Sequence, residues 1–274
     1  MTINAVNAGE KWLPYCKAEK ELIFTVHSVF NRVINISTGK ELLSVAAEDV
    51  GCSSSFLTVP GNFLNYSAEA GQKCFMRAGC LYLAGCEINF NNAAVWKGPI
   101  SKNYRYKKIN SENIAAFKAV VDRKAAPESA WRQICSGSPC QKPDKWHGLG
   151  LIKTLRENPL AASKLIGLGP GLTPSGDDML LGFLAMANHA SGNRAFVRLL
   201  HKEVAGLLGK TADISAQALA NALNCEYHEY IQNCLRDLCE NGKEEVFISA
   251  ADLLKIGATS GADIACGMYF GMCD

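Results

Sequence analysis

The sequence predicts an α+β protein. A β-rich N-terminal domain, a barrel or sandwich of residues 1–110, precedes a mainly helical C-terminal domain of residues 111–274. Short β-branched or aromatic runs separated by Gly and Pro occupy residues 22–107, whereas apolar residues recur every three or four positions from Ser111 onward. The 274 residues are 48% hydrophobic and 20% charged, which suffices for a sizeable core and excludes a disordered or collagen-like chain.

Individual elements follow from the same patterns. Strands are expected at the apolar runs 22–30, 32–36, 55–59 and 80–84, each of which lies near turn residues. Ser111 is the expected N-cap of the first helix, and Ile114, Phe117 and Val120 form its buried face. Further helices are expected over residues 149–165, 178–189, 194–208, 214–239 and 244–256, with a last one from Ala262. Residues 125–148, rich in Ser, Pro, Gly and Lys, are expected to form a surface excursion.

The charge balance argues against nucleic acid and against an anionic membrane surface as partners. The formal charge is +2, and no run of five like charges occurs. The basic, Tyr-containing segment 97–108 is therefore interpreted as a solvated loop or a subunit contact. The longest apolar stretch, residues 179–187, is about half the ~20 residues of a transmembrane helix. The first residues lack the pattern of a secretory signal, and a cytoplasmic location is expected.

The cysteines are interpreted mainly as reduced, buried thiols. Twelve in 274 residues is about 4%, below the ~8–10% of disulfide scaffolds. A soft-metal site assembled from distant cysteines stays open as an alternative. The sequence has no C-x2-C pair and no H-E-x-x-H among its five His, so a zinc hydrolase is not expected.

The most informative stretch is a glycine-rich loop, residues 167–182 (GLGPGLTPSGDDMLLG). Three glycines among its first five residues allow positive φ and leave backbone N–H groups unshielded. Thr173 is the expected N-cap of a helix with Pro174 at its first position, and Ser175 is an alternative cap. A helix N-terminus attracts phosphate or carboxylate. The loop is neither a Walker A loop nor a dinucleotide-binding loop, and a capped turn between two helices is the alternative interpretation.

A second segment, residues 257–267 (GATSGADIACG), repeats the frame Ser-Gly-x-Asp-x-x-x-Gly. The matching positions are Ser175, Gly176, Asp178 and Gly182 in the first copy and Ser260, Gly261, Asp263 and Gly267 in the second. The repeat predicts two equivalent helix N-termini that converge on one polar site, with Gly182 and Gly267 allowing close helix packing. A structural pseudo-repeat in a helical bundle is the alternative.

Three acidic residues lie in these loops. Asp177, Asp178 and Asp263 could hold a divalent cation such as Mg²⁺, position a substrate amide or orient the loop. No other cofactor is expected.

Candidates outside the loops are weaker. Arg32 and Asn35 place polar groups in an apolar strand, where they either face solvent or serve function. Thr211 and Ser215 are interpreted as helix caps in preference to ligands. His189 and His228 are interpreted as ordinary helix residues without a catalytic role.

With these two loops the chain resembles the AllH family, which is named after a subunit of the oxamate carbamoyltransferase of anaerobic allantoin breakdown. Arg32 and Asn35, then Thr211 and Ser215, then the closing Ser-Gly-Ala-Asp segment follow the order that the family has. The resemblance covers most of the chain, although residues 111–150 carry little recognisable pattern. Position 176 can be His in relatives, so Gly176 is not expected to be indispensable.

The resemblance implies a subunit of a multi-subunit enzyme of purine catabolism that is inactive without its partner subunits. The implied reaction converts oxalurate and phosphate into oxamate and carbamoyl phosphate. The Ser-x-Arg-Thr-Arg signature of ordinary carbamoyltransferases is missing, so a different fold is expected to do related chemistry. Preorganised N–H donors would stabilise the tetrahedral centre of carbamoyl transfer.

Under this interpretation Asp178 and Asp263 are catalytic and orient the carbamoyl amide or the attacking nitrogen. The residues assigned to substrate and phosphate binding are Gly169, Gly171, Thr173, Ser175, Gly176, Asp177, Thr259, Ser260, Gly261, Arg32, Asn35 and Ser215. Two other functions stay open, because a fold alone does not determine function. One is a non-catalytic scaffold or regulatory anion-binding subunit, and the other is an independent enzyme acting on a small carboxylate or acyl phosphate.

Overall fold

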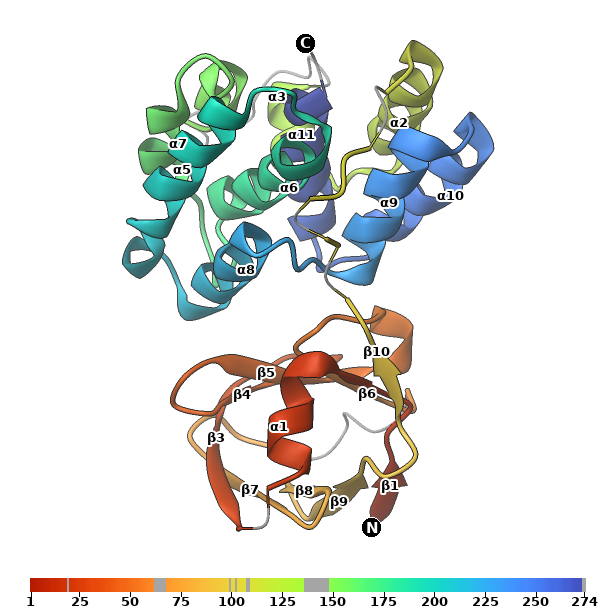
Figure 1. Cartoon of the computed structure of the whole chain (residues 1–274), viewed down its shortest axis with the longest axis vertical. Helices are drawn as coiled ribbons and strands as arrows, with labels where there is room; N and C mark the ends of the chain where they lie inside the picture. The colour runs from red at the N-terminus through yellow and green to blue at the C-terminus, as the bar shows by residue number, and fades with distance from the viewer. Residues whose placement is uncertain are drawn as a thin grey trace. The chain divides into compact units, whose positions relative to one another are not determined.

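The computed structural model describes residues 1–18, 20–61, 68–98, 100–101, 103–106, 109–135 and 148–272. The chain forms two compact units, Met1–Pro99 and Ile100–Asp274. Strands make up the first unit and helices the second, which confirms the predicted α+β class (Figure 1). Within the described residues, no helix combines the length and the apolar character needed to cross a membrane.

The ten strands of the described N-terminal unit form one sheet that curls on itself (Figure 1). They are β1 (Thr2–Asn4), β2 (Asn7–Gly9), β3 (Leu22–Val29), β4 (Val33–Ser37), β5 (Leu42–Ala47), β6 (Phe56–Val59), β7 (Lys73–Arg77), β8 (Cys80–Leu83), β9 (Cys86–Asn89) and β10 (Ala94–Trp96). Their order in the sheet is β1-β9-β8-β7-β3-β4-β5-β6-β2-β10. The four predicted strands correspond to β3, β4, β6 and β8, and the other six were not predicted.

One face of this sheet carries the core of the N-terminal unit. Alternate residues of neighbouring strands, such as Ile36, Leu43 and Leu57, are fully buried, as the two-residue period of a strand requires. The short helix η1 (Glu10–Trp12) adds Trp12 to that core, and the following α1 (Leu13–Cys16) packs the partly buried Tyr15 and Cys16 against it. The Trp12 indole N–H donates to the Ser55 carbonyl over 2.9 Å, so its one polar atom is satisfied. A further short helix, η2, spans Glu48–Val50.

The second unit is helical. Its α-helices are α2 (Ser111–Lys124), α3 (Ala130–Ile134), α5 (Ala162–Leu165), α6 (Ser175–Ala190), α7 (Arg194–Ala205), α8 (Asp213–Leu223), α9 (Glu229–Glu240), α10 (Lys243–Leu253) and α11 (Ser260–Met272). Short 3-10 helices are η4 (Leu149–Thr154), η5 (Pro159–Ala161) and η6 (Leu208–Lys210). Of the predicted surface excursion 125–148, residues 136–147 lie outside the described residues.

Three predictions about these helices are wrong. The helix expected over residues 149–165 is three short pieces, because Pro159 cannot continue a helix from the preceding turn. The helix expected over 214–239 is two helices, α8 and α9, separated near Cys225, whose φ of 63° lies in the left-handed region. Asn110 caps α2 in place of Ser111, because its side chain accepts the backbone N–H of Asn113.

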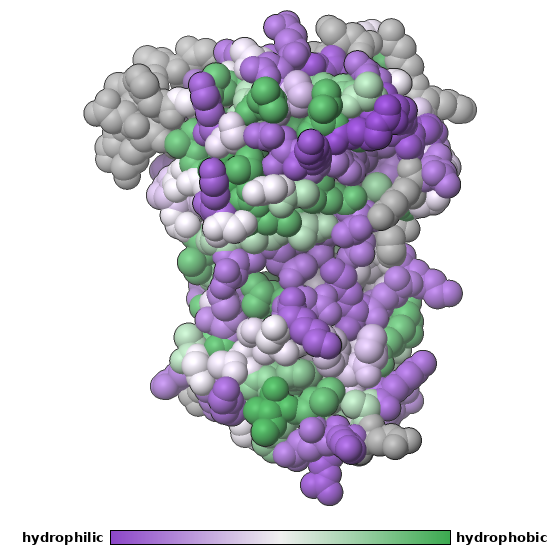
Figure 2. Space-filling model, turned by 60° about the vertical axis from the view of Figure 1, so that its left-hand side comes forward, coloured by the Kyte–Doolittle hydropathy of each residue, from purple (hydrophilic) through white to green (hydrophobic). Residues whose placement is uncertain are grey.

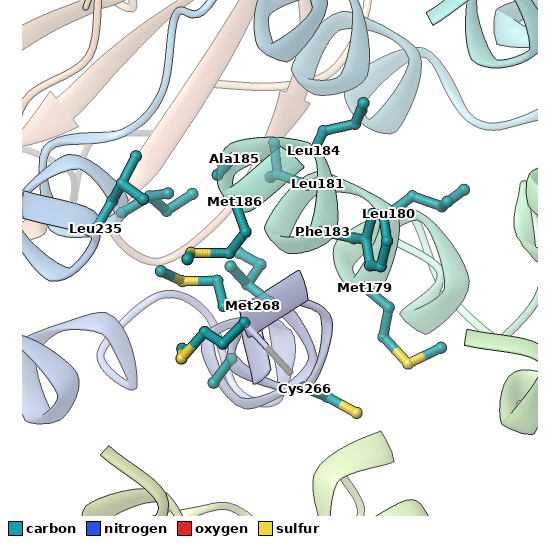
Figure 3. Close-up of a cluster of buried hydrophobic side chains, with 14 of the residues drawn as sticks. Met179, Leu180, Leu181, Phe183, Leu184, Ala185, Met186, Leu235, Cys266 and Met268 are labelled. Atoms are coloured by element: carbon teal, nitrogen blue, oxygen red, sulfur yellow. The ribbon is translucent and has the colours of Figure 1, made fainter. Parts of the chain in front are cut away.

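Helices α6 and α11 form the centre of the second unit. Nearly every residue of both is buried, and in Figure 3 the apolar side chains of α6 project on several sides of the helix. The predicted close packing through Gly182 and Gly267 is confirmed. A Cβ on Gly182 would overlap the carbonyl oxygen of Ile264, and a Cβ on Gly267 would overlap that of Met179. These contacts are reciprocal, as at an interface with two-fold symmetry.

The equivalence of the two halves continues into the turn before each helix. The N–H of Gly176 donates to Leu168 and that of Gly261 to Ile256, each over 2.8 Å. A Cβ on Gly176 would overlap the Leu165 carbonyl oxygen. This backbone therefore leaves no room for a side chain at position 176, whereas the expectation that Gly176 is not indispensable stays a prediction.

On the face shown in Figure 2, hydrophobic residues form small separate patches among hydrophilic ones. Large apolar side chains exposed in the described residues include Ile23 and Phe75 on the sheet and Leu160, Leu199 and Ile248 on the helices. Most of the described cysteines are buried, among them Cys74, Cys234 and Cys266.

We expect Gly267→Ala to destabilise the protein by about 3 kcal/mol, because the new methyl group would force α11 away from the Met179 carbonyl. Urea unfolding of the full chain measures this. Gly192→Ala is the matched control, because a Cβ at Gly192 meets no atom within 4 Å among the described residues. Its effect should stay within about 0.5 kcal/mol. Equal stability of both variants would contradict the close approach of the two helices.

Candidate functional site

The two predicted loops meet at the N-termini of α6 and α11. The hydroxyl oxygens of Thr173 and Ser260, 87 positions apart in the sequence, lie 3.2 Å apart. The predicted N-cap is wrong: Pro174 precedes α6, and no side chain caps the helix. The Pro174 carbonyl accepts from Asp177 and Asp178, as the Thr259 carbonyl accepts from the equivalent positions of α11. Thr173 is therefore free of a capping role and faces the other helix.

Each helix supplies a hydroxyl to the carboxyl group of the other helix. The Ser260 hydroxyl hydrogen-bonds with Asp178, and the Ser175 hydroxyl hydrogen-bonds with Asp263. The arrangement is reciprocal because the same frame begins both helices. It joins four of the residues singled out by the sequence repeat.

Both carboxyl groups are buried and hold their protons unusually well. Burial raises the pKa of Asp263 to about 7, although hydrogen bonds from Ser175 and from the Ala130 backbone oppose the shift. Burial also raises the pKa of Asp178 well above its ordinary value, and the negative charges of Asp263 and Asp177 add to that effect. In the described residues, one oxygen atom of each carboxyl group, Oδ2, has no hydrogen-bond partner. A carboxyl group whose pKa is near 7 and which has an oxygen without a hydrogen-bond partner can donate or accept a proton.

The two halves differ in exposure. Ser175 is 6% exposed, whereas Ser260 is half-buried and contacts the half-buried Thr173. Asp263 is fully buried, and its Oδ1 accepts the backbone N–H of Ala130, at the start of α3, over 2.5 Å. Sequence reasoning missed Ala130, because a backbone donor leaves no signal in residue type. Only the Asp178–Ser260 pair therefore reaches toward the surface.

Asp177 holds the first loop in place. Its Oδ1 accepts the backbone N–H of Gly167 over 2.8 Å, and its Oδ2 accepts the Thr211 hydroxyl. Burial raises the pKa of Asp177, and the hydrogen bonds from Thr211 and Gly167 lower it. Thr211, interpreted as a cap, thus hydrogen-bonds with Asp177, whereas the buried Ser215 hydroxyl has no hydrogen-bond partner among the described residues. Helix α8 is preceded by Ala212 without a side-chain cap.

The glycines of the first loop require their positive φ angles. Gly169 has φ 126°, and a Cβ there would lie 2.7 Å from the backbone nitrogen of Ser175. Gly171 has φ 88° and is exposed together with Leu172. Within the described chain, neither Leu172 nor Thr173 donates its backbone N–H to another backbone group. The loop therefore presents free donors beside the N-terminus of α6.

The other candidates have local partners. Arg32 forms an exposed ion pair with Asp49 in the N-terminal unit. Asn35 is buried there, donating to the Ser28 hydroxyl over 2.9 Å and accepting from the Ser44 hydroxyl over 2.7 Å. These two candidates belong to the N-terminal unit, whereas the paired helix starts belong to the second unit.

The two histidines singled out from the sequence have structural surroundings. His189 is buried, and burial lowers its pKa, while His228 caps α9. Among the residues that the structure describes, no three His, Cys, Asp or Glu side chains are grouped to hold a metal ion. Asp177, Asp178 and Asp263 therefore do not form such a group. Both carboxylate oxygens of Asp177 accept hydrogen bonds from the protein.

Comparison with known families agrees with the two-loop arrangement. Residues 165–272, which contain both loops, match the family model described as oxamate carbamoyltransferase subunit AllH. Residues 4–95 match the model of the AllH family N-terminal domain. The chain belongs to the AllH family. The resemblance predicted from the sequence is thus confirmed, and the description of the AllH family as a subunit indicates that other chains take part. No curated protein and no solved structure matches the chain significantly.

We expect Thr211→Val to destabilise the protein by about 1.5–3 kcal/mol, because Asp177 loses a hydroxyl donor while staying buried. Thr211→Ser keeps the hydroxyl and should retain most of the stability. Urea unfolding compares the two variants. If Thr211→Val is as stable as the wild type, the hydroxyl group makes no stabilising hydrogen bond to Asp177.

Stability should depend on pH through Asp263. A buried carboxyl group with a raised pKa stabilises the fold below its unfolded pKa, near 4, and loses that contribution as the pH rises to about 7. Relative to the wild type, Asp263→Asn should therefore gain up to about 4 kcal/mol between pH 4 and pH 8, at ~1.4 kcal/mol per pKa unit. Ser175→Ala removes a donor and should move the wild-type transition to higher pH. A constant difference between wild type and Asp263→Asn would show that Asp263 does not titrate in this range.

Proposed function

We propose that the chain is a subunit of an oxamate carbamoyltransferase that converts oxalurate and phosphate into oxamate and carbamoyl phosphate in purine catabolism. The observation that carries this proposal is the reciprocal Ser–Asp pairing at two joined helix N-termini, with an unpartnered oxygen on each carboxyl group. The description of the AllH family as an oxamate carbamoyltransferase subunit supports this reaction type. Other subunits of the enzyme are the proposed protein partners, and the cytoplasm is the proposed location.

The first loop is the proposed binding site for an anionic end of the substrates. The backbone N–H groups of Leu172 and Thr173 and the positive end of the α6 dipole favour a phosphate or carboxylate beside Gly169 and Gly171. Thr259, Ser260 and the turn before α11 would line the other side. The remaining candidates support these loops: Gly176 and Gly261 allow the turns, and Asp177 anchors the first loop through the Gly167 N–H. Ser215 lies buried at the start of α8.

The chemistry requires proton transfer to a leaving nitrogen. A phosphate oxygen attacks the ureido carbon of oxalurate, a C–O bond forms, and the bond from that carbon to the oxamate nitrogen then breaks. The electron pair stays on the nitrogen, which needs a proton. We assign this proton to the Ser260 hydroxyl, which is replenished by protonated Asp178 behind it. The proton that phosphate releases on attack can return Asp178 to its starting state.

The two carboxyl groups have different proposed roles. Asp178 acts through the half-buried Ser260, which can touch a substrate. Asp263 is fully buried and holds Ser175 and α3, so it positions the helix start. The sequence interpretation gave both aspartates a catalytic role. This proposal keeps that role for Asp178 and makes Asp263 a positioning residue.

The test is carbamoyl phosphate formation from oxalurate and phosphate by the complete complex. Ser260→Ala should lower kcat about 100-fold, as loss of one preorganised donor does. Asp178→Asn should lower kcat similarly and change its pH profile, because the amide cannot supply the proton. The KM for phosphate should change little in Asp178→Asn, since this variant keeps the first loop and the Ser260 hydroxyl. Ser111→Ala, an exposed hydroxyl at the start of α2, is the matched control and should keep full activity.

The same variants distinguish the alternative functions. If Ser260→Ala and Asp178→Asn lower turnover only as far as they fail to assemble with the other subunits, the chain is a scaffold. If the isolated wild-type chain turns over a small carboxylate or acyl phosphate without partners, it is an independent enzyme. Unchanged turnover with normal assembly would refute the proposed site.

A further inference from the structure

Two cysteines face each other beside the buried carboxyl pair. The sulfur atoms of Cys135 and Cys266 lie 3.6 Å apart, close enough for a thiol hydrogen bond, although 131 positions separate them in the sequence. Cys135 follows α3 and is half-buried, whereas Cys266 lies inside α11 and is fully buried. In Figure 3 the Cys266 side chain points away from α6.

The thiol pair is one of two contacts that hold the ends of α3 against α11. The N–H of Ala130, the first residue of α3, donates to Asp263. Cys135, one residue after the end of α3, contacts Cys266. Cys266 lies three positions after Asp263 on α11. Between these points the Trp131 ring packs edge-on against Tyr269, with the ring centroids 5.4 Å apart. Helix α3 is thus held against α11 at both ends and in the middle.

We propose that Cys135 and Cys266 form a reversible disulfide that fastens α3 to α11 behind Asp263. An S–S bond is about 2.05 Å long, so the two sulfurs need to approach by roughly 1.5 Å. The side chains already point toward each other, and the exposed edge of Cys135 gives an oxidant access. This site is independent of the proposed carbamoyl transfer.

The oxidant would be a small-molecule disulfide such as oxidised glutathione. The Cys135 thiolate attacks one sulfur of the oxidant, a mixed disulfide forms, and one thiolate leaves. Cys266 then loses its proton to solvent, its sulfur attacks the Cys135 sulfur, and the second thiolate leaves. Two protein thiols are oxidised and one small disulfide is reduced to two thiols. Burial and the neighbouring Cys135 thiol raise the pKa of Cys266 well above its ordinary value, so Cys135 reacts first.

Mass spectrometry of the full chain tests the proposal. The reduced protein is treated with oxidised glutathione, the remaining thiols are alkylated after unfolding, and the digest is examined for a peptide joining residues 135 and 266. Oxidation should also raise Tm by roughly 5 °C or more, because the bond constrains a long loop of the unfolded chain. Dithiothreitol should reverse both changes.

Two variants make the result specific. Cys135→Ser changes a half-buried position with little loss of packing and should abolish the Tm shift. Cys16→Ser, a half-buried cysteine of the N-terminal unit, should keep the shift. Hydrogen exchange of the peptide covering α3 should slow on oxidation in the wild type and in Cys16→Ser only. Recovery of alkylated Cys266 after oxidation, with Cys135 linked to glutathione or to another cysteine, would overturn the proposal.

Discussion

The close contact between the backbones of α6 and α11 determines the rest of the candidate site. Gly182 and Gly267 have no side chain, so a carbonyl oxygen of the opposite helix occupies the space where a Cβ would lie. The helix starts, about two turns earlier, therefore lie side by side. At that separation a serine of one helix reaches the aspartate of the other. Larger residues at the two glycines would move each hydroxyl out of reach of its carboxyl partner.

The electrostatics of the pair follow from this geometry. Asp178 and Asp263 lie in a low-dielectric interior with hydroxyl and amide donors as their hydrogen-bond partners. Neutral donors only partly offset the cost of burying a charge, so both groups retain protons to a higher pH than an exposed aspartate would. A cationic partner would have had the opposite effect and would have kept the carboxyl groups ionised. The two buried carboxyl groups thus keep protons that can exchange, and Asp178 does so beside the half-buried Ser260 hydroxyl. Carboxyl groups with raised pKa values are typical of functional sites.

The sequence predicted the α+β class and the paired helix starts, because both leave periodic signals. The repeated Ser-Gly-x-Asp frame is visible as letters, and the two glycines indicated close packing. The partners of each carboxyl group were not predictable, since a serine at a helix start can cap its own helix as readily as it can bind across. The contact of Asp263 with the Ala130 N–H was equally hidden. Strands such as β1, β2 and β10 escaped because three residues are too few to show a period.

The pairing of the short strands also governs when the N-terminal unit can fold. Strand β2, near residue 8, lies between β6 and β10, and β1 pairs with β9. Strand β1 therefore cannot pair until β9, some 85 positions later in the sequence, is present. Such long-range pairing makes the sheet slow to form compared with the mainly local contacts of a helical hairpin. Until β9 has been synthesised, β1 has no strand to pair with, and unpaired strands of this kind make a folding chain prone to aggregation.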